Sequence, residues 1–171
     1  MKIGFKLSVN SIEDAREQIR NYKDHLKDKT DEFLERLSEV GIEVINANVA
    51  QATGADDKNV QIETEISRDG NKAVMTMTIS GKDLLFIEYG AGIRFNNGNT
   101  HPWAHKHGYG IGTYPGQKHA FDPNGWYYRV PPGKGGKLHH SYGTEATMPV
   151  YKAHMEMIKQ AEKIAKEVFN G

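Results

Sequence analysis

Histidines are the residues of this chain whose spacing first suggests chemistry. His101, His105 and His107 lie in one short segment, and neutral imidazoles are good ligands for zinc or nickel. However, the spacing His-x3-His-x-His matches no established structural zinc motif, and the chain has no cysteine and no His-Glu-x-x-His sequence. A metal-dependent hydrolase that uses Glu88 with these three histidines therefore stays an alternative, and we assign no metal, cofactor or catalytic residue.

Other catalytic patterns are equally incomplete. Ser141 does not lie in a Gly-x-Ser-x-Gly sequence, and the glycine-rich run at 108–112 lacks the Gly-Lys-Ser/Thr of a phosphate-binding loop. Beyond Glu88, the carboxylates before Pro149 are Asp122 and Glu145, and nothing in the sequence brings two acids to one cleft as a glycosidase requires. We therefore do not expect an enzyme.

Aromatic and basic residues gather between positions 90 and 147. This stretch interleaves tyrosines and tryptophans with arginines and lysines, a mixture typical of single-strand nucleic-acid surfaces and of protein–protein interfaces. We favour the interface, because no nucleic-acid motif accompanies the mixture. The candidate contact residues, from this stretch and the segment leading into it, are Glu88, Tyr89, Gly90, Gly92, Arg94, Trp103, Tyr114, Phe121, Trp126, Tyr127 and Arg129.

The flanking sequence predicts the elements that must position this stretch. Apolar residues recur at helical spacing over 12–40, after Ser11 as N-cap. A second helical piece follows over 42–54, with Gly41 as a break or kink. The long apolar stripe fits packing within its own domain or an intermolecular coiled coil, and we favour the former.

A hairpin and a second helix complete the expected fold. Alternating segments at 60–67 and 73–80 flank Asp69-Gly70, a strong hairpin signal. Residues 84–89 are a third strand or a helical turn, and a second amphipathic helix covers 149–169. We expect one α+β domain: a long N-terminal helix, an antiparallel β-sheet with hairpin, a long Gly/Pro/aromatic loop, and a C-terminal helix packed on the sheet.

Length and composition indicate how many domains the chain has and where in the cell it acts. The 171 residues predict one domain, with its core in 11–89 and 149–169 and an interaction loop at 91–148. Because 22 basic residues balance 22 acidic ones, no net charge draws the chain to nucleic acid or to an anionic membrane. No apolar run approaches the roughly 20 residues of a membrane span, so we expect a cytoplasmic protein unless it leaves within a larger particle.

The segment Phe86-Ile87-Glu88-Tyr89-Gly90-Ala91-Gly92 resembles the V-E-F-G-T-G hallmark of tail-completion or neck proteins of tailed phages. That family is named after the tenth gene product of a lambdoid phage. The loop from His101 to Trp126 is similar to that of members from phages of Gram-positive hosts. The chain departs from the family where Ala91 replaces a frequent Thr, and where Gln51-Ala52 replace the usual proline.

The resemblance implies a structural role. Such proteins assemble as rings, usually hexameric, at the head–tail junction or the top of the tail. Their neighbours are the connector or adaptor, the tail terminator or the tail tube, and the ring contacts DNA transiently in its channel. This implies a virion protein assembled in the host cytoplasm. Because a disordered loop would leave many aromatic side chains exposed, we expect the loop to order on contact with other subunits. A DNA-contacting collar component is a further alternative.

Overall fold

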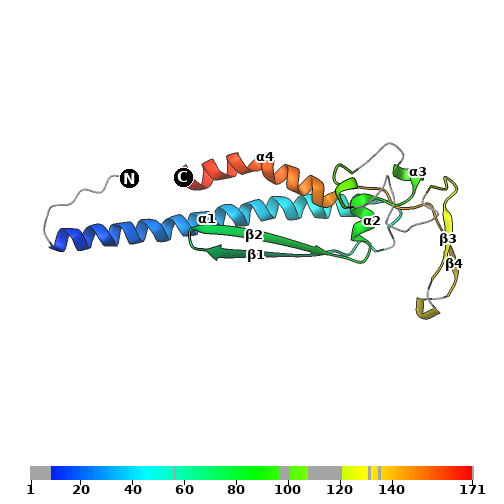
Figure 1. The fold of residues 1–171 in the computed structure, drawn as a ribbon, viewed down its shortest axis with the longest axis horizontal. Coiled ribbons are helices and arrows are strands. Elements are labelled where there is room, and N and C mark those ends of the chain that lie inside the picture. The colour runs from blue at the N-terminus through cyan, green and yellow to red at the C-terminus, as the bar shows by residue number, and fades with distance from the viewer. Residues whose placement is uncertain are drawn as a thin grey trace.

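The computed structural model describes residues 9–55, 57–96, 101–107, 121–130, 132–134 and 136–170. Its elements, in order, are α1 (Val9–Gln51), β1 (Gln61–Asp69), β2 (Lys72–Ser80), α2 (Leu84–Tyr89), α3 (Ile93–Asn96), η1 (His105–His107), β3 (Trp126–Arg129), η2 (Pro132–Lys134), β4 (Leu138–Ser141) and α4 (Pro149–Asn170). The expected α+β class is confirmed. The molecule is elongated: α4 lies along one side of α1, the β1–β2 hairpin along the other, and β3–β4 at one end (Figure 1).

The first helix is continuous, which corrects two details of the sequence interpretation. It begins at Val9, so Ser11 lies inside its first turn and is not its N-cap. It also runs through Gly41 without a break. A Cβ at Gly41 would lie 2.8 Å from Met157 Sδ and 2.9 Å from Met77 Cε. The glycine therefore serves packing, because it lets α4 and β2 approach α1 closely.

Two apolar clusters hold the body together. One joins α1, α2 and α4 through Ile45, Val49, Ala52, Ile87 and Ala153, with side chains of both strands packed against it. The other joins the middle of α1 to the C-terminal half of α4 through Leu37, Ile164 and Val168. The C-terminal helix thus packs against α1 in both clusters, and in the first it shares the core with side chains of both strands.

The N-terminal part of α1 extends beyond this core. Ile12, Ile19, Tyr22 and Leu26, all members of the predicted apolar stripe, are between 42% and 55% exposed. The Lys29 ammonium donates to the carbonyl of Val168 near the end of α4. Packing within the domain is therefore confirmed for the C-terminal half of the stripe but not for its N-terminal half.

The predicted hairpin is present. Asp69 pairs with Lys72, which leaves Gly70 and Asn71 as its two-residue loop, and Gly70 has a φ of 58°, as a primed turn requires. In β2 burial alternates along the strand, and odd-numbered residues from Ala73 to Ile79 are half-buried. One face of the hairpin therefore packs on α1 and the other is exposed.

Residues 84–89, for which the sequence allowed either a strand or a helical turn, form the short helix α2. It buries Ile87 and Glu88 and leaves Leu85 exposed. The helix stops at Gly90, which has a φ of 77° and donates its N–H to the Phe86 carbonyl at 2.8 Å. The positive φ at this position favours glycine, because other residues adopt it only with strain.

Within the interaction loop the structure contains a second hairpin that the sequence analysis missed. Trp126 pairs with Ser141 and Arg129 with Leu138, antiparallel. Both ends of the loop also belong to the core, because Ala91 bridges Thr144 and Ala91, Ala146 and Met148 are buried. The domain core therefore includes residues outside the ranges 11–89 and 149–169 that the sequence predicted for it.

Some predictions fall outside the described residues. These are the short lead-in before Val9, most of the loop between 97 and 120, and the candidate contact residue Tyr114. Within the described part of the chain, no helix combines the length and apolar character that crossing a bilayer requires.

Candidate functional site

Glu88 is the first residue of the Glu-Tyr-Gly turn and is 4% exposed. Its Oε2 accepts the N–H of Val150 at 2.7 Å, and its Oε1 accepts the N–H of Tyr151 at 3.0 Å. Both amides belong to the first turn of α4, which starts at Pro149. A carboxylate here caps the helix and faces the positive end of its dipole. Glu88 therefore ties down two backbone amides of α4.

His101 completes this buried network. Its Nε2 lies 2.7 Å from Glu88 Oε1, and its Nδ1 accepts the backbone N–H of Trp103 at 3.0 Å. Because an imidazole nitrogen that accepts an N–H carries no proton, the proton sits on Nε2 and is donated to Glu88. His101 is therefore a neutral ring beside a carboxylate, and it positions the loop on α2 and α4.

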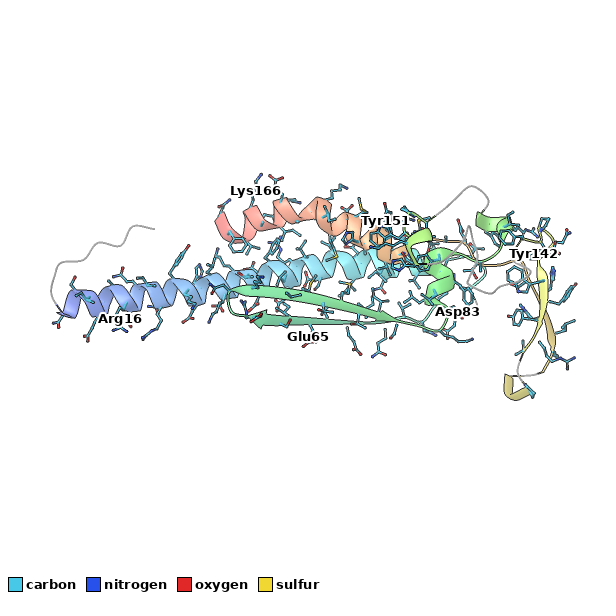
Figure 2. The ribbon with its side chains drawn as sticks, in the orientation of Figure 1. Arg16, Glu65, Asp83, Tyr142, Tyr151 and Lys166 are labelled. Atoms are coloured by element: carbon cyan, nitrogen blue, oxygen red, sulfur yellow. The ribbon has the colours of Figure 1, made fainter. Side chains whose placement is uncertain are left out.

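Aromatic rings enclose the Glu88–His101 pair. The His101 ring centroid lies 4.6 Å from that of Tyr89 and 5.4 Å from that of Tyr151. Trp103 packs edge-on against Tyr151, with centroids 5.0 Å apart. Figure 2 shows Tyr151 at the end of α4 that meets α2. The motif therefore fastens three segments together, with its polar groups satisfied and shielded from water.

The histidine cluster does not converge on a metal site among the described residues. They contain no group of three His, Cys, Asp or Glu side chains that could hold an ion. The ring of His107 packs on Tyr89, 6.1 Å between centroids, and the side chain of His105 lies outside the described part. Both nitrogens of His101 are hydrogen-bonded, so it could bind a metal only by losing one of these partners.

A second junction, beside the first, is made of backbone and glycine. A Cβ at Gly143, where φ is 97°, would lie 1.8 Å from the Ala91 carbonyl oxygen. A Cβ at Gly54, where φ is 80°, would lie 2.1 Å from the Gly143 carbonyl oxygen. The backbones at Gly54, Ala91 and Gly143 thus lie so close together that no side chain fits between them. This arrangement anchors the base of the second hairpin to the end of α1.

A cleft of about 500 Å³ opens beside this junction. Asp83 forms part of its wall and accepts the N–H of Asp57 at 2.9 Å. The cleft runs between the start of α2, α3 and the inner face of β3–β4, and its wall mixes aromatic rings with a few polar groups. Its other lining side chains include Lys82, Phe86, Phe95, Trp126, Tyr128, His139 and His140.

The outer side of the second hairpin carries a row of stacked planar groups. The Arg94 guanidinium lies 3.9 Å from the centroid of the Tyr142 ring. Tyr142 packs edge-on against His140 at 4.5 Å, and His140 packs on Tyr127 at 4.4 Å. Figure 2 places Tyr142 at this end of the molecule. Tyr127 is 66% exposed, so the row presents an aromatic surface to solvent.

The structure divides the candidate contact residues into an internal and an external group. Glu88, Gly90 and Gly92 are buried, and Tyr89, Trp103 and Trp126 are half-buried around the junctions and the cleft. Arg94, Phe121, Tyr127 and Arg129 are exposed. His101 as a structural partner, and His140 and Tyr142 in the stacked row, were not predicted from the sequence. The available signal for the hairpin was the run of strand-forming aromatic residues at 126–128.

Comparison with known proteins gives no relative: the chain matches no family model, no curated protein and no solved structure. The resemblance to phage neck proteins therefore rests on the sequence motif alone, and a role in a phage particle is a proposal.

Proposed function

We propose that this chain is a structural virion protein of a tailed bacteriophage that forms a ring, expected to be hexameric, at the head–tail junction or the top of the tail. The observation that carries the proposal is the uncovered apolar surface at both ends of an elongated molecule. At one end it is the N-terminal stripe of α1, with Ile19 55% exposed; at the other it is the β3–β4 hairpin, with Leu138 64% exposed.

Two separate surfaces of this kind favour contacts between copies. When a subunit uses two different patches, each copy binds its neighbours head-to-tail, and such contacts close into a ring when the rotation allows. Exposed aromatic and arginine side chains, as at Tyr127 and Arg129, are those that contribute most to protein interfaces. The Glu-Tyr-Gly turn supports the proposal by holding the hairpin at a fixed place on the body.

The mass of the purified protein in solution tests this function. We expect mass photometry to show an oligomer, and electron microscopy to show rings. Mass spectrometry of virions from the phage that encodes the chain should detect it together with connector, terminator or tail-tube proteins. A protein that stays monomeric at all concentrations and is absent from virions would contradict the proposal.

A shortened variant tests the role of the loop. Because His101 and Ala104 are buried, removing the whole loop would damage the core. Replacing residues 127–140 by Asn-Gly keeps Trp126 and Ser141, which are paired across the hairpin, and closes them with a tight turn. We expect a folded protein that no longer builds particles, and infectious virions from this variant would contradict the role of the hairpin.

The alternative of a metal-dependent hydrolase has a separate test. Elemental analysis of protein purified without a histidine tag would support it if zinc were present in stoichiometric amount. No specific observation in the described residues favours this alternative, because His101 is held by Glu88 and by the amide of Trp103.

A further inference from the structure

The β1–β2 hairpin has an uncovered acidic face. Residues of β1 that point away from α1 include Glu63 and Glu65, opposite Thr78 and Thr76 of β2. Glu63 accepts the side-chain amide of Gln61 at 2.9 Å, and no cation of the described residues forms an ion pair with Glu63 or Glu65. Figure 2 shows Glu65 on the side of the hairpin away from α1. We call this surface the acidic sheet face.

The β3–β4 hairpin has an uncovered basic face. Cross-strand pairing puts Tyr127 with His140 and Arg129 with Leu138 on one side of it. Lys137 is the exposed residue directly before Leu138, where the strand begins. The segment from Trp126 to Tyr142 contains no acidic residue. Within the described part of the chain, no carboxylate pairs with Arg129 or Lys137. We call this surface the basic hairpin face.

We propose that the basic hairpin face of one copy docks on the acidic sheet face of a second copy. This rests on the proposed ring and names the two surfaces that join its subunits. The acidic sheet face and the basic hairpin face carry charges of opposite sign, so one face can neutralise the other on a second copy. Both faces belong to two-stranded antiparallel sheets, and side chains of two packed sheets can interdigitate.

Each face also offers apolar area to its counterpart. Val74, which pairs with Ser67 toward the turn of the acidic sheet face, is 52% exposed, and Tyr127 and Leu138 on the basic hairpin face are 66% and 64% exposed. Contact between these side chains would remove water from around the charge pairs and strengthen them. Opposite charges around an apolar centre also fix the register of the two sheets.

The arrangement of the two faces excludes their contact within one copy. The acidic sheet face lies along α1, whereas the basic hairpin face lies at the end of the molecule beyond α2 (Figure 1). Each copy therefore gives one face to one neighbour and accepts the other face from a second neighbour. This is a heterologous contact, the kind that builds a ring or an open helical filament.

Charge reversal tests the proposal. One variant carries Arg129→Glu and Lys137→Glu, and the other carries Glu63→Lys and Glu65→Lys. Each variant alone brings like charges together at every contact, so we expect self-association to weaken by about 100-fold or more. An equimolar mixture of the two variants restores opposite charges at every contact and should assemble. The chain carrying all four substitutions should also assemble alone.

A matched control separates this effect from net charge and folding. Lys159→Glu with Lys163→Glu changes the net charge as much as the Arg129/Lys137 variant does, at side chains that are each 72% exposed on α4. The control should assemble as the wild type does. All variants should keep the wild-type circular dichroism and melting temperature, because every changed side chain lies on the surface.

The outcomes distinguish this inference from the proposed function. If the wild type assembles and the charge variants assemble equally well, or the mixture fails to recover, the named surfaces are wrong and the ring stands. If the Arg129/Lys137 variant loses salt-dependent DNA binding but keeps self-association, the basic face binds nucleic acid and the inference fails. If the wild type never assembles, both the ring and its interface are overturned.

Discussion

At the scale of single residues, Glu88 decides how the loop joins the body. Its carboxylate accepts three hydrogen bonds, from His101 and from two amides of α4, while it is almost fully removed from water. A buried charge is tolerated only when donors surround it. The Glu-Tyr-Gly motif therefore has a mechanical explanation, in which the acid supplies the clamp and the glycine ends the helix.

Replacing Glu88 by Ala should destabilise the protein by about 3–5 kcal/mol, because it leaves buried donors of α4 and His101 without an acceptor. Urea unfolding followed by circular dichroism measures this change. Glu65→Ala is the control, since it removes an exposed carboxylate and should change the unfolding free energy by less than about 0.5 kcal/mol. A loss under about 1 kcal/mol for the Glu88 variant would refute the clamp.

Gly143→Ala should cost about 3 kcal/mol or more, because the new methyl group would overlap the backbone carbonyl of Ala91 and the φ of 97° disfavours any side chain. Gly70→Ala is the matched control: it also has a positive φ, of 58°, but no atom lies within 4 Å of the added carbon. We expect that control to lose only about 1–2 kcal/mol. Equal losses in thermal melts would show that crowding is unimportant at the junction.

The contacts of Glu88 were not predictable from the sequence, because this residue meets its partners only through tertiary packing. Val150 and Tyr151 lie 62 and 63 positions away along the chain, and His101 lies 13 positions away. The same limit hid the glycine junction, since Gly54 and Gly143 come together only in the folded chain.

At the scale of elements, the path of α1 is set by what it packs against. Gly41 lies where side chains of α4 and β2 both approach the helix, although glycine lowers helix propensity by about 1 kcal/mol relative to alanine. Local propensity predicted a break there, and tertiary packing removed it. The helix, the first hairpin and α4 were otherwise predictable, because each has a long periodic pattern.

Gly41→Leu should destabilise the protein by about 1–3 kcal/mol by overpacking the space between Met77 and Met157. Gly41→Ala is the comparison, and we expect it to be nearly neutral. Its methyl group meets only the flexible ends of two methionines, and the gain in helix propensity offsets that crowding. Chemical denaturation compares the two, and a leucine variant as stable as the wild type would contradict close packing at this position.

The second hairpin could not be recognised with the same ease. Its strands are only four residues each, and prolines and glycines lie between them. Over so few residues, alternation does not separate a strand from a loop. The hairpin owes its stability to the aromatic pairs across it and to the junction at its base, which are contacts that only the folded chain provides.

At the scale of the whole molecule, the structure has a packed centre and two uncovered ends. We expect Ile12→Ala with Ile19→Ala to leave the unfolding free energy within about 1 kcal/mol of the wild type, because both side chains are exposed. Leu37→Ala, in the packed part of α1, is the contrast and should cost about 2–5 kcal/mol. A double variant that unfolds as easily as the Leu37 variant would show that this end packs in the monomer.

The clamp at Glu88 also has a consequence for the exchange of backbone hydrogens with solvent. First-turn amides of most helices have no partner inside the helix and exchange quickly. Here the N–H groups of Val150 and Tyr151 are bound to a buried carboxylate, so deuterium should enter them slowly. These two amides then act as a built-in probe: their exchange should quicken whenever the segment carrying His101 lifts away from the body.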